Sequence, residues 1–391
     1  MKVICERGAL LEAVNQISGV VASRTPRPQL TCVKMVATKA DGAGELILSA
    51  TDAEITLTLR LGRVEVSQEG EALVPADKLR QIVSAEDNEP TLTIETDDET
   101  CTIRGADAEF KLNTFSVSDF PKIPSFTEIS AGSAAAPAAK CVFQTDTAAF
   151  ESLVSRTLFA AARENSRYAI NGVLMNREGK KLEMVATDGR RLALATTTLT
   201  GKPAGDDAHC IIPAKALSMV LKLMGDAEEP VHVAVTENQA VFAMGDDPAD
   251  SRAVLATNLV EGAFPPYEDV IPKDQDIRVG FDRDVLASAV RRAALLTNEE
   301  SRGVRLAFNG SEKTLRLSSR SPEMGEAKVD VSLMSYDGSD IEIGFNPQFL
   351  TDALKVIPDA EVVIELKASN KPGLFRSGSD FVYVVMPVNL Q

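Results

Sequence analysis

The sequence predicts an α+β protein built from three similar domains, each with two helices and several antiparallel strands. Three observations predict this class: a repeat spaced at about one third of the 391-residue chain, apolar patterns of both helical and strand period, and runs of strands between the helices in place of strict β-α-β alternation. A chain of this length suggests two to four domains, and an apolar share of 44% is enough for a core in each.

The clearest marker of the repeat is a strand followed by a Thr-Asp pair. One predicted strand ends at Thr51-Asp52 and a second ends at Thr187-Asp188, while Ser319-Arg320 takes the same place in the last third. The first residues of these pairs are 136 and 132 residues apart. Taken alone, Thr187-Asp188 would be interpreted as a turn.

A short helix with a proline at its start follows each pair. Its proline is Pro75, Pro213 or Pro347, and steps of 138 and 134 residues separate the three. Proline fits the first helical turn because its missing N–H would have no partner there. An alternating run, typical of a half-buried strand, follows each helix at residues 91–94, 231–235 and 361–365.

A longer amphipathic helix opens each third, and these helices are predicted at residues 8–22, 147–163 and 283–296. Phe120-Pro121 and Phe264-Pro265 mark turns that close the first two thirds, and the alanine-rich residues 131–139 indicate a linker. The predicted organisation is a first domain at 1–128, a linker at 129–140, a second domain at 141–264 and a third at 265–391.

The charge differs between helices and the rest of the chain. The 41 Lys and Arg against 57 Asp and Glu give a net charge of −16, which argues against a generally basic nucleic-acid binder. The six predicted helices sum to +5, which leaves −21 on strands and loops. Two interpretations stay open: ordinary solvated helix faces, or six helices that form one mildly basic wall backed by acidic sheets.

Little in the composition suggests catalysis, a metal or a cofactor. The five cysteines are scattered without a CxxC pair, so buried thiols are expected rather than zinc ligands or disulfides, and there are only two histidines. An enzyme would depend on Asp188 with His209-Cys210, but no glycine-rich phosphate loop follows a strand. No apolar run approaches the ~18–20 residues of a membrane span and the start lacks a signal-peptide layout, so a cytoplasmic location is expected.

Five motifs in order make the whole chain resemble the bacterial DNA polymerase III beta subunit family, the replicative sliding clamps. The motifs are Val185-Ala186-Thr187-Asp188-Gly189-Arg190-Arg191-Leu192, Arg167-Tyr168-Ala169-Ile170-Asn171-Gly172-Val173-Leu174, Ser301-Arg302-Gly303-Val304-Arg305-Leu306, Ile343-Gly344-Phe345-Asn346 and Tyr383-Val384-Val385-Met386-Pro387.

The resemblance implies the DNA clamp fold, closed into a ring by a head-to-tail homodimer whose twelve helices line the hole. Twelve helices at ~9–10 Å spacing give a circumference of ~115 Å and an axis-to-axis diameter near ~36 Å. Subtracting a helix radius of ~5 Å on each side leaves a hole of ~26 Å, which admits a duplex about 20 Å wide. A single three-domain chain would enclose too small a circle, so this interpretation requires a dimer.

The implied function is that of a processivity factor, a non-catalytic subunit of a DNA-directed DNA polymerase holoenzyme. It encircles double-stranded DNA without sequence specificity and tethers the polymerase catalytic subunit, the clamp loader, and repair and translesion polymerases. Weak phosphate contacts permit sliding, whereas base contacts would hold the ring at one site. Loading would require a separate ATP-driven opener, because no nucleotide site is recognisable in the sequence.

Candidate DNA-contacting residues come from two sources. The family pattern implies Arg24, Arg167 and Tyr168, and the helix charge count adds Arg80, Lys215 and Lys222, each of which is otherwise a solvated surface cation.

The family also binds short peptide tails of its partners in an apolar cleft between the second and third domains. Leu, Val and Met suit an adaptable apolar pocket, and arginines with Asn346 suit the carbonyls or carboxylates of an extended peptide. The implied cleft residues are Ile170, Thr187, Gly189, Arg190, Arg191, Leu192, Pro265, Val270, Asn346, Phe349, Pro372, Val384, Met386, Pro387, Val388 and Leu390.

The dimer contact of the family maps onto Phe110 and Leu112 on one side and Leu295 and Leu296 on the other. Two departures from the family pattern accompany it. Asp107 and Glu109 stand near Phe110 where basic residues are frequent, and Glu323 and Glu326 lie on the facing side, so like charges would weaken the contact. Asn389 replaces a frequent arginine and Gln391 extends the tail, which would change peptide preference. A scaffold that binds peptides without DNA is the main rival interpretation.

Overall fold

The computed structural model describes residues 1–22, 24–40, 43–97, 99–132, 138–163, 169–225, 229–297 and 303–389. Their contacts divide the chain into two compact units whose boundary runs through the second predicted domain. The first unit comprises Met1–Phe150, Leu199–Ala208 and Lys215–Leu259, and the second comprises Glu151–Thr198, His209–Ala214 and Val260–Gln391. Among the described residues, no helix combines the length and apolar character needed to cross a bilayer.

The first unit contains two antiparallel sheets. One has the order β5-β1-β7-β8-β9, with bounds Glu65–Gln68, Lys2–Glu6, Thr91–Thr96, Thr100–Arg104 and Glu109–Asn113. The other has the order β14-β10-β16-β17-β18-β4-β3-β2-β6, with bounds Ala204–Gly205, Cys141–Asp146, Pro230–Val235, Gln239–Met244, Ala253–Asn258, Ile55–Leu61, Ala43–Thr51, Cys32–Ala40 and Gly70–Pro75.

The second unit is built in the same way. Its larger sheet has the order β15-β11-β12-β13-β27-β26-β25-β19-β23, with bounds Ala208–Pro213, Gly172–Glu178, Lys181–Thr187, Arg191–Thr198, Phe381–Val385, Gly373–Ser377, Glu361–Leu366, Ile277–Asp282 and Ser335–Asp337. Its smaller sheet has the order β22-β21-β20-β24, with bounds Gly325–Ser332, Thr314–Ser321, Val304–Asn309 and Ile341–Phe345.

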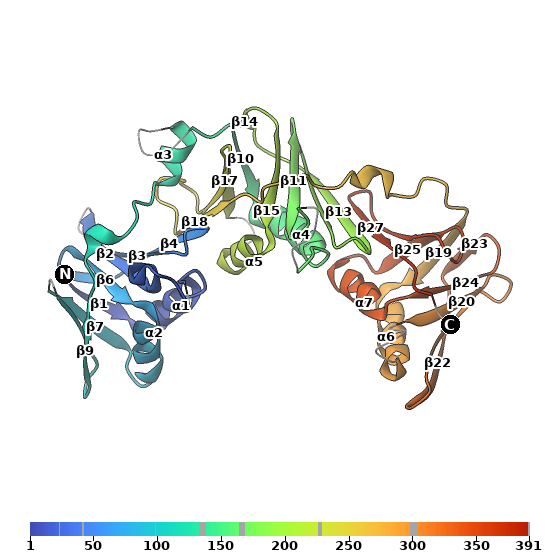
Figure 1. The fold of residues 1–391 in the computed structure, drawn as a ribbon, viewed down its shortest axis with the longest axis horizontal. Helices are drawn as coiled ribbons and strands as arrows, with labels where there is room; N and C mark the ends of the chain where they lie inside the picture. The colour runs from blue at the N-terminus through green and yellow to red at the C-terminus, as the bar shows by residue number, and fades with distance from the viewer. Residues whose placement is uncertain are drawn as a thin grey trace. The chain divides into compact units, whose positions relative to one another are not determined.

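Seven α-helices occur in the described residues. They are α1 (Arg7–Ile17), α2 (Ala76–Ala85), α3 (Phe126–Ala131), α4 (Thr147–Leu158), α5 (Ala214–Leu223), α6 (Arg283–Ala293) and α7 (Pro347–Val356). Within their own units α1 packs beside α2 and α6 beside α7 (Figure 1). Leu10, Val14 and Ile17 show the helical spacing that the sequence predicted, and α1 buries all three.

The element order confirms the threefold repeat and the α+β class. Each third runs strand, helix, five strands, helix, three strands, so that β1, β10 and β19 correspond, as do β4, β13 and β22, and β9, β18 and β27. The longer helix is therefore the second element of each third, and the proline-marked helix is the eighth. Of the α-helices in the described residues, α3 alone falls outside this scheme.

The strand pairing shows how consecutive thirds are joined. The last strand of the second third, β18, pairs with β4 of the first, and β27 of the last third pairs with the corresponding strand β13 of the second. The third pair of this series would join β9 to β22. In the described part of the chain each of these two strands ends its sheet, because β9 pairs with β8 and β22 with β21.

The predicted helix bounds need correction. The long helices are shorter than predicted: α1 ends at Ile17, α4 at Leu158 and α6 at Ala293, where a 3-10 turn continues to Leu296. Pro75 and Pro213 are the last residues of β6 and β15 and directly precede α2 and α5, so only Pro347 lies in a first helical turn. Pro75 keeps an extended ψ of 117°, which lets it end the strand and start the helix.

The predicted linker overlaps α3. Ser125 and Glu128 form a capping box at its start, and Phe126 and Ile129 are buried against strands β16 and β17. Residues 129–131 are therefore helical and not linker, while residues 133–137 lie outside the described residues.

Candidate functional site

The turn between β12 and β13 has a hydrogen-bond pattern that explains its Thr-Asp sequence. Thr187 Oγ1 donates to the Arg191 carbonyl at 2.6 Å and accepts from the Gly189 N–H at 3.1 Å. Asp188 Oδ1 accepts from the N–H groups of Arg190 and Arg191 at 2.9 and 3.1 Å. Gly189 has a φ of +85°, a conformation that favours glycine. The prediction that Thr187-Asp188 forms a turn is confirmed.

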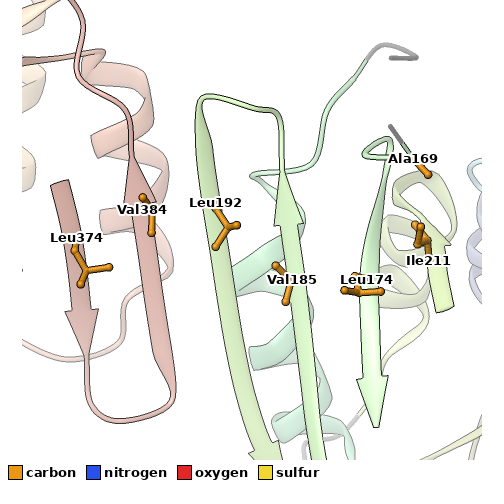
Figure 2. Packing of buried hydrophobic residues seen from close by; sticks show 7 residues of the cluster. All are labelled: Ala169, Leu174, Val185, Leu192, Ile211, Leu374 and Val384. Carbon is orange, nitrogen blue, oxygen red and sulfur yellow. The ribbon is translucent and has the colours of Figure 1, made fainter. Parts of the chain in front are cut away.

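A row of cross-strand neighbours beside this turn forms an apolar floor. Thr187 lies opposite Leu192, Leu192 opposite Val384, and Val384 opposite Leu374, so the row crosses four strands from β12 to β26. Figure 2 shows Leu192 and Val384 next to each other on β13 and β27. Because Leu192 and Val384 are at most 2% exposed, the floor is a continuation of the core.

Two chain segments form the walls above this floor. The segment from Pro265 to Val270 follows the predicted end of the second domain, and it includes a 3-10 turn at Tyr267–Asp269. On the other side, the chain leaving β27 is held beside the turn by a hydrogen bond of 2.9 Å from the Met386 N–H to the Arg190 carbonyl. Val270 is 45% exposed and Met386 40% exposed, so the walls have a solvent-facing rim.

Floor and walls enclose a predominantly apolar cavity of about 170 Å³, hereafter the apolar cavity. Ten of the sixteen predicted cleft residues line it, and the structure adds Tyr267. The lining residues are Ile170, Thr187, Gly189, Arg190, Arg191, Leu192, Pro265, Tyr267, Val270, Val384 and Met386.

The other predicted cleft residues lie elsewhere. Pro387 and Val388 line a neighbouring cavity of about 500 Å³ that shares Met386 with the apolar cavity. Asn346 caps α7 by accepting from the Gln348 N–H at 2.9 Å, so this carbonyl oxygen is engaged within the chain. Phe349 and Pro372 do not line the apolar cavity, and Leu390 lies outside the described residues.

Arg191 lines the apolar cavity, but its guanidinium is engaged by partners within the chain. Its side chain is only 10% exposed, and its guanidinium donates to Asp188 at 3.0 Å, to Asp352 at 2.8 Å and to the Phe159 carbonyl at 2.8 Å. It also lies over the Phe349 ring, 4.5 Å from the centroid. Burial opposes its charge, yet these acidic partners outweigh burial and raise the pKa of Arg191. Contact of both arginines with a peptide stays a prediction.

Arg190 differs from its neighbour. It is exposed, and within the described residues its side chain makes no recorded hydrogen bond or ion pair, so its guanidinium is available at the rim.

Tyr267 was missed by sequence reasoning. Its hydroxyl donates to Glu183 Oε1 at 2.6 Å, which fastens the wall segment to β12, and Glu183 is only 7% exposed. Burial and this hydrogen bond raise the pKa of Tyr267, so the group stays a donor. The available signal was its position between Pro265 and Val270, where an amphipathic ring suits a wall with one wet side.

The four described DNA candidates differ in how free their charges are. Lys215 is bound to Asp52 at 2.8 Å, and Arg80 lies 3.4 Å from Asp77 with both groups exposed. Arg24 and Lys222 are exposed and form no recorded ion pair with another described residue. All four belong to the first unit, and Arg167 and Tyr168 lie outside the described residues.

Two of the predicted dimer residues lie on the edge strand β9, and the other two lie in the 3-10 turn that packs beside the edge strand β22. Phe110 and Leu112 share one face of β9 and are half-buried, while Leu295 is 75% exposed in the 3-10 turn after α6. The acidic neighbours are partly neutralised within the chain: Glu109 pairs with Arg104 at 2.6 Å and Glu326 with Lys328 at 3.2 Å. The expected repulsion is therefore smaller than a count of acids suggests.

The rival catalytic set does not form around Asp188, because its carboxylate is used by the turn and by Arg191. His209 is an exposed residue of β15, and all five cysteines are buried, as predicted.

The threefold repeat and the pairing of its corresponding strands define the class of protein: a chain of three successive clamp domains. Comparisons with known proteins agree over the full chain. Residues 1–124, 144–266 and 268–389 match the N-terminal, central and C-terminal domains of the DNA polymerase III beta subunit. The beta sliding clamp of Pseudomonas putida (strain KT2440) is 32% identical over 388 residues, 98% of this chain and 99% of that protein. The beta sliding clamp of Escherichia coli (strain K12) is 30% identical over 395 residues and all of both chains.

Solved structures give the same result. A sliding clamp from Pseudomonas aeruginosa bound to griselimycin has a TM-score of 0.87 at 31% identity, and one from Bacillus subtilis has 0.87 at 27%, each over 100% of both chains. The chain belongs to the DNA polymerase III beta subunit family.

Proposed function

We propose that this chain is the sliding clamp of a replicative DNA polymerase, a processivity factor that encircles duplex DNA without reading its sequence. It acts as a non-catalytic subunit of the holoenzyme in the cytoplasm and holds the polymerase and other partners through the apolar cavity. Membership of the beta subunit family over all three domains supports this role. The observation that carries the encircling mechanism is the pairing of corresponding edge strands.

The strand pairs β18 with β4 and β27 with β13 define one joint that is used twice within the chain. The same joint, made a third time, requires β9 of one copy and β22 of another. Such a contact is head-to-tail, and a head-to-tail contact produces a closed assembly when its rotation permits closure. A homodimer makes two of these contacts and leaves no clamp-joint edge free.

In the proposed ring, a small number of cationic side chains contact the DNA. Arg24 and Lys222 are the strongest candidates because their charges are exposed and not engaged by a described acid. Lys215 contributes less, since Asp52 already neutralises it at 2.8 Å. A few phosphate contacts give weak, salt-sensitive binding that permits sliding.

The apolar cavity is the proposed docking site for peptide segments of partner proteins. Its floor offers Leu192 and Val384 to an apolar side chain, and Arg190 at the rim suits a carboxylate or a carbonyl. Because the related clamp from P. aeruginosa is bound to griselimycin, we expect this chain to bind the same compound in this cavity.

Retention on DNA tests the encircling mechanism. The protein is loaded onto nicked circular DNA by a clamp loader, isolated by gel filtration and challenged by linearising the circle. A ring held by topology is lost from free ends and stays on intact circles. Equal retention on both would contradict encirclement, and retention on neither would support a scaffold that acts without DNA.

Assembly is tested separately by light scattering across a concentration series. A dimer is expected, and replacing Leu112 with Asp on β9 should shift the protein to monomers because it places a charge in the proposed joint. The matched control is Leu306→Asp on β20, a buried core position, which should unfold the protein and not merely dissociate it. A wild-type monomer at micromolar concentration would contradict a stable ring.

A further inference from the structure

Three methionines are exposed among the described residues, and one of them, Met386, lines the apolar cavity. Met324 and Met334 are 53% and 55% exposed and line neither the apolar cavity nor its neighbour. Met386 is 40% exposed and lines both. It therefore combines access from solvent with a place in the proposed binding surface.

The backbone at Met386 is fixed while its side chain reaches solvent. The Met386 N–H donates to the Arg190 carbonyl at 2.9 Å, and the Val388 N–H donates to the Gly344 carbonyl at 2.9 Å. A chemical change at the thioether alters the cavity wall without releasing the chain that carries it.

The cysteines of the chain are poor competitors for an oxidant. All five are buried. Burial raises the pKa of Cys5 and of Cys101 to about 12, and it raises the pKa of Cys32 as well, although the Thr31 hydroxyl opposes that shift. A thiol reacts with peroxide as the thiolate, so these groups are slow targets and the exposed thioethers are the accessible ones.

We propose that Met386 is a reversible oxidation site whose sulfoxide form releases partners from the apolar cavity. The oxidant is hydrogen peroxide: the O–O bond breaks, an S–O bond forms at the thioether, sulfur loses two electrons and water leaves. Thiol-dependent methionine sulfoxide reductases return the thioether. The inference rests on the proposed function, because it regulates the same cavity.

The consequence follows from the polarity of the lining. A thioether packs well beside Leu192 and Val384, whereas a sulfoxide oxygen is a strong hydrogen-bond acceptor that a docked apolar segment would bury. Burying an acceptor without a donor lowers affinity by about tenfold or more. Arg190 lines the same cavity with an exposed guanidinium, which is available to donate to the sulfoxide oxygen and so to stabilise the oxidised form.

The test compares four proteins before and after a peroxide treatment that is stopped with catalase. They are wild type, Met386→Leu, the double variant Met324→Leu/Met334→Leu, and Met386→Gln as a polar substitute that needs no oxidant. Oxidised positions are mapped by peptide mass spectrometry, affinity for griselimycin and for the polymerase catalytic subunit is measured by calorimetry, and folding is checked by circular dichroism.

We expect treated wild type and the treated double variant to lose at least about tenfold in affinity and to recover it after sulfoxide reductase. Met386→Leu should keep its affinity within about twofold after treatment, and Met386→Gln should be weak before it. Unchanged affinity with Met386 fully oxidised would overturn the proposal. So would oxidation of Met324 and Met334 that spares Met386, or an equal loss in Met386→Leu.

Failure of the proposed docking role and failure of the proposed oxidation at Met386 would give different results. If untreated wild type bound neither probe, the docking role of the cavity would be wrong and the regulation with it. The mass map would still decide whether Met386 is the oxidation site.

Discussion

Two turns that correspond in the repeat, Thr51–Ile55 in the first unit and Thr187–Arg191 in the second, share one hydrogen-bond pattern. In both, the Thr hydroxyl donates to the carbonyl four residues on, and the Asp carboxylate accepts from two successive N–H groups. The residue after Asp has a positive φ in both: +77° at Ala53 and +85° at Gly189. The repeat therefore reproduces the backbone closely.

The side chains beside the two turns differ, and only one set builds an apolar floor. The row Thr187, Leu192 and Val384 in the second unit corresponds to Thr51, Thr56 and Ala256 in the first. Thr56 donates to the Thr51 hydroxyl at 2.8 Å, which Leu192 cannot do. The comparison teaches that local hydrogen bonds set the shared fold, whereas Leu192 and Val384, in place of Thr56 and Ala256, give one copy an apolar floor.

Removing Arg191 should have the largest effect on this comparison. Arg191→Ala leaves Asp188 and Asp352 without their buried cation, so the free energy of unfolding should fall by about 3–5 kcal/mol in urea titration. Arg190→Ala is the matched control at the next position, where the exposed side chain should cost less than about 0.5 kcal/mol. Equal losses in the two variants would mean that the buried ion pairs stabilise nothing.

Exchanging the corresponding residues Leu192 and Thr56 should affect griselimycin binding only in the second unit. Leu192→Thr copies the first unit and should weaken griselimycin binding by about tenfold or more, because a hydroxyl replaces apolar surface at the floor. Thr56→Leu makes the reverse change in the first unit and should leave that affinity unaltered. Calorimetry on folded variants measures both, and an effect of Thr56→Leu equal to that of Leu192→Thr would place the binding site elsewhere.

Substitutions at the positive-φ residue of each turn should change the free energy of unfolding in opposite directions. Gly189→Ala should lower the free energy of unfolding by about 1 kcal/mol, since a Cβ there meets no neighbour within 4 Å and only the positive φ opposes it. Ala53→Gly relieves the same strain and should stabilise by up to about 0.5 kcal/mol after the entropic cost of glycine. Thermal melts of the pair check the signs, and shifts of the same sign would rule out a shared strain.

The smallest effect concerns pH at the first turn. Burial opposes ionisation of Asp52, but the Lys215 ammonium and the N–H groups of Ile55 and Glu54 outweigh it, so the pKa of Asp52 lies below its ordinary value. Because the pKa of Asp52 is lower in the folded state, its ionised carboxylate stabilises the folded protein above the unfolded pKa of about 4. This stabilisation is lost as the pH falls through the pKa of the folded state. Wild type should exceed Asp52→Asn by about 0.5 kcal/mol at pH 7, since Lys215 is well exposed, and by nothing near pH 2. A gap that persisted at pH 2 would exclude the charge as its source.

Much of the fold was predictable because its signals are local. The Thr-Asp turns, the amphipathic face of α1 and the alternation in β25 depend on neighbours in sequence. Helix ends were less predictable: Val20 continues the apolar spacing of α1 and is buried, but the helix has already ended at Ile17. Helix α3 was overlooked although Ser125 and Glu128 have the spacing of a capping box.

Ten of the eleven residues that line the apolar cavity were among the predicted cleft residues, but the contacts that each of them makes were not predictable. Resemblance grouped Arg190 with Arg191, and only the packing of Phe349, Asp352 and Asp188 around one of them separates a structural arginine from an exposed one. Tyr267 escaped because its partner Glu183 lies 84 positions away in sequence, where no local pattern points to it.

The edge strands β9 and β22 also affect the newly made chain. Exposed edges such as β9 and β22 invite pairing with strands of unrelated proteins and thus aggregation. Both carry alternating charge, with Glu109 and Lys111 on one and Glu326 and Lys328 on the other. Lysines and acids on an edge disfavour indiscriminate partners. The charges on these two edge strands therefore protect the chain during synthesis, a role separate from any part they play in the proposed joint.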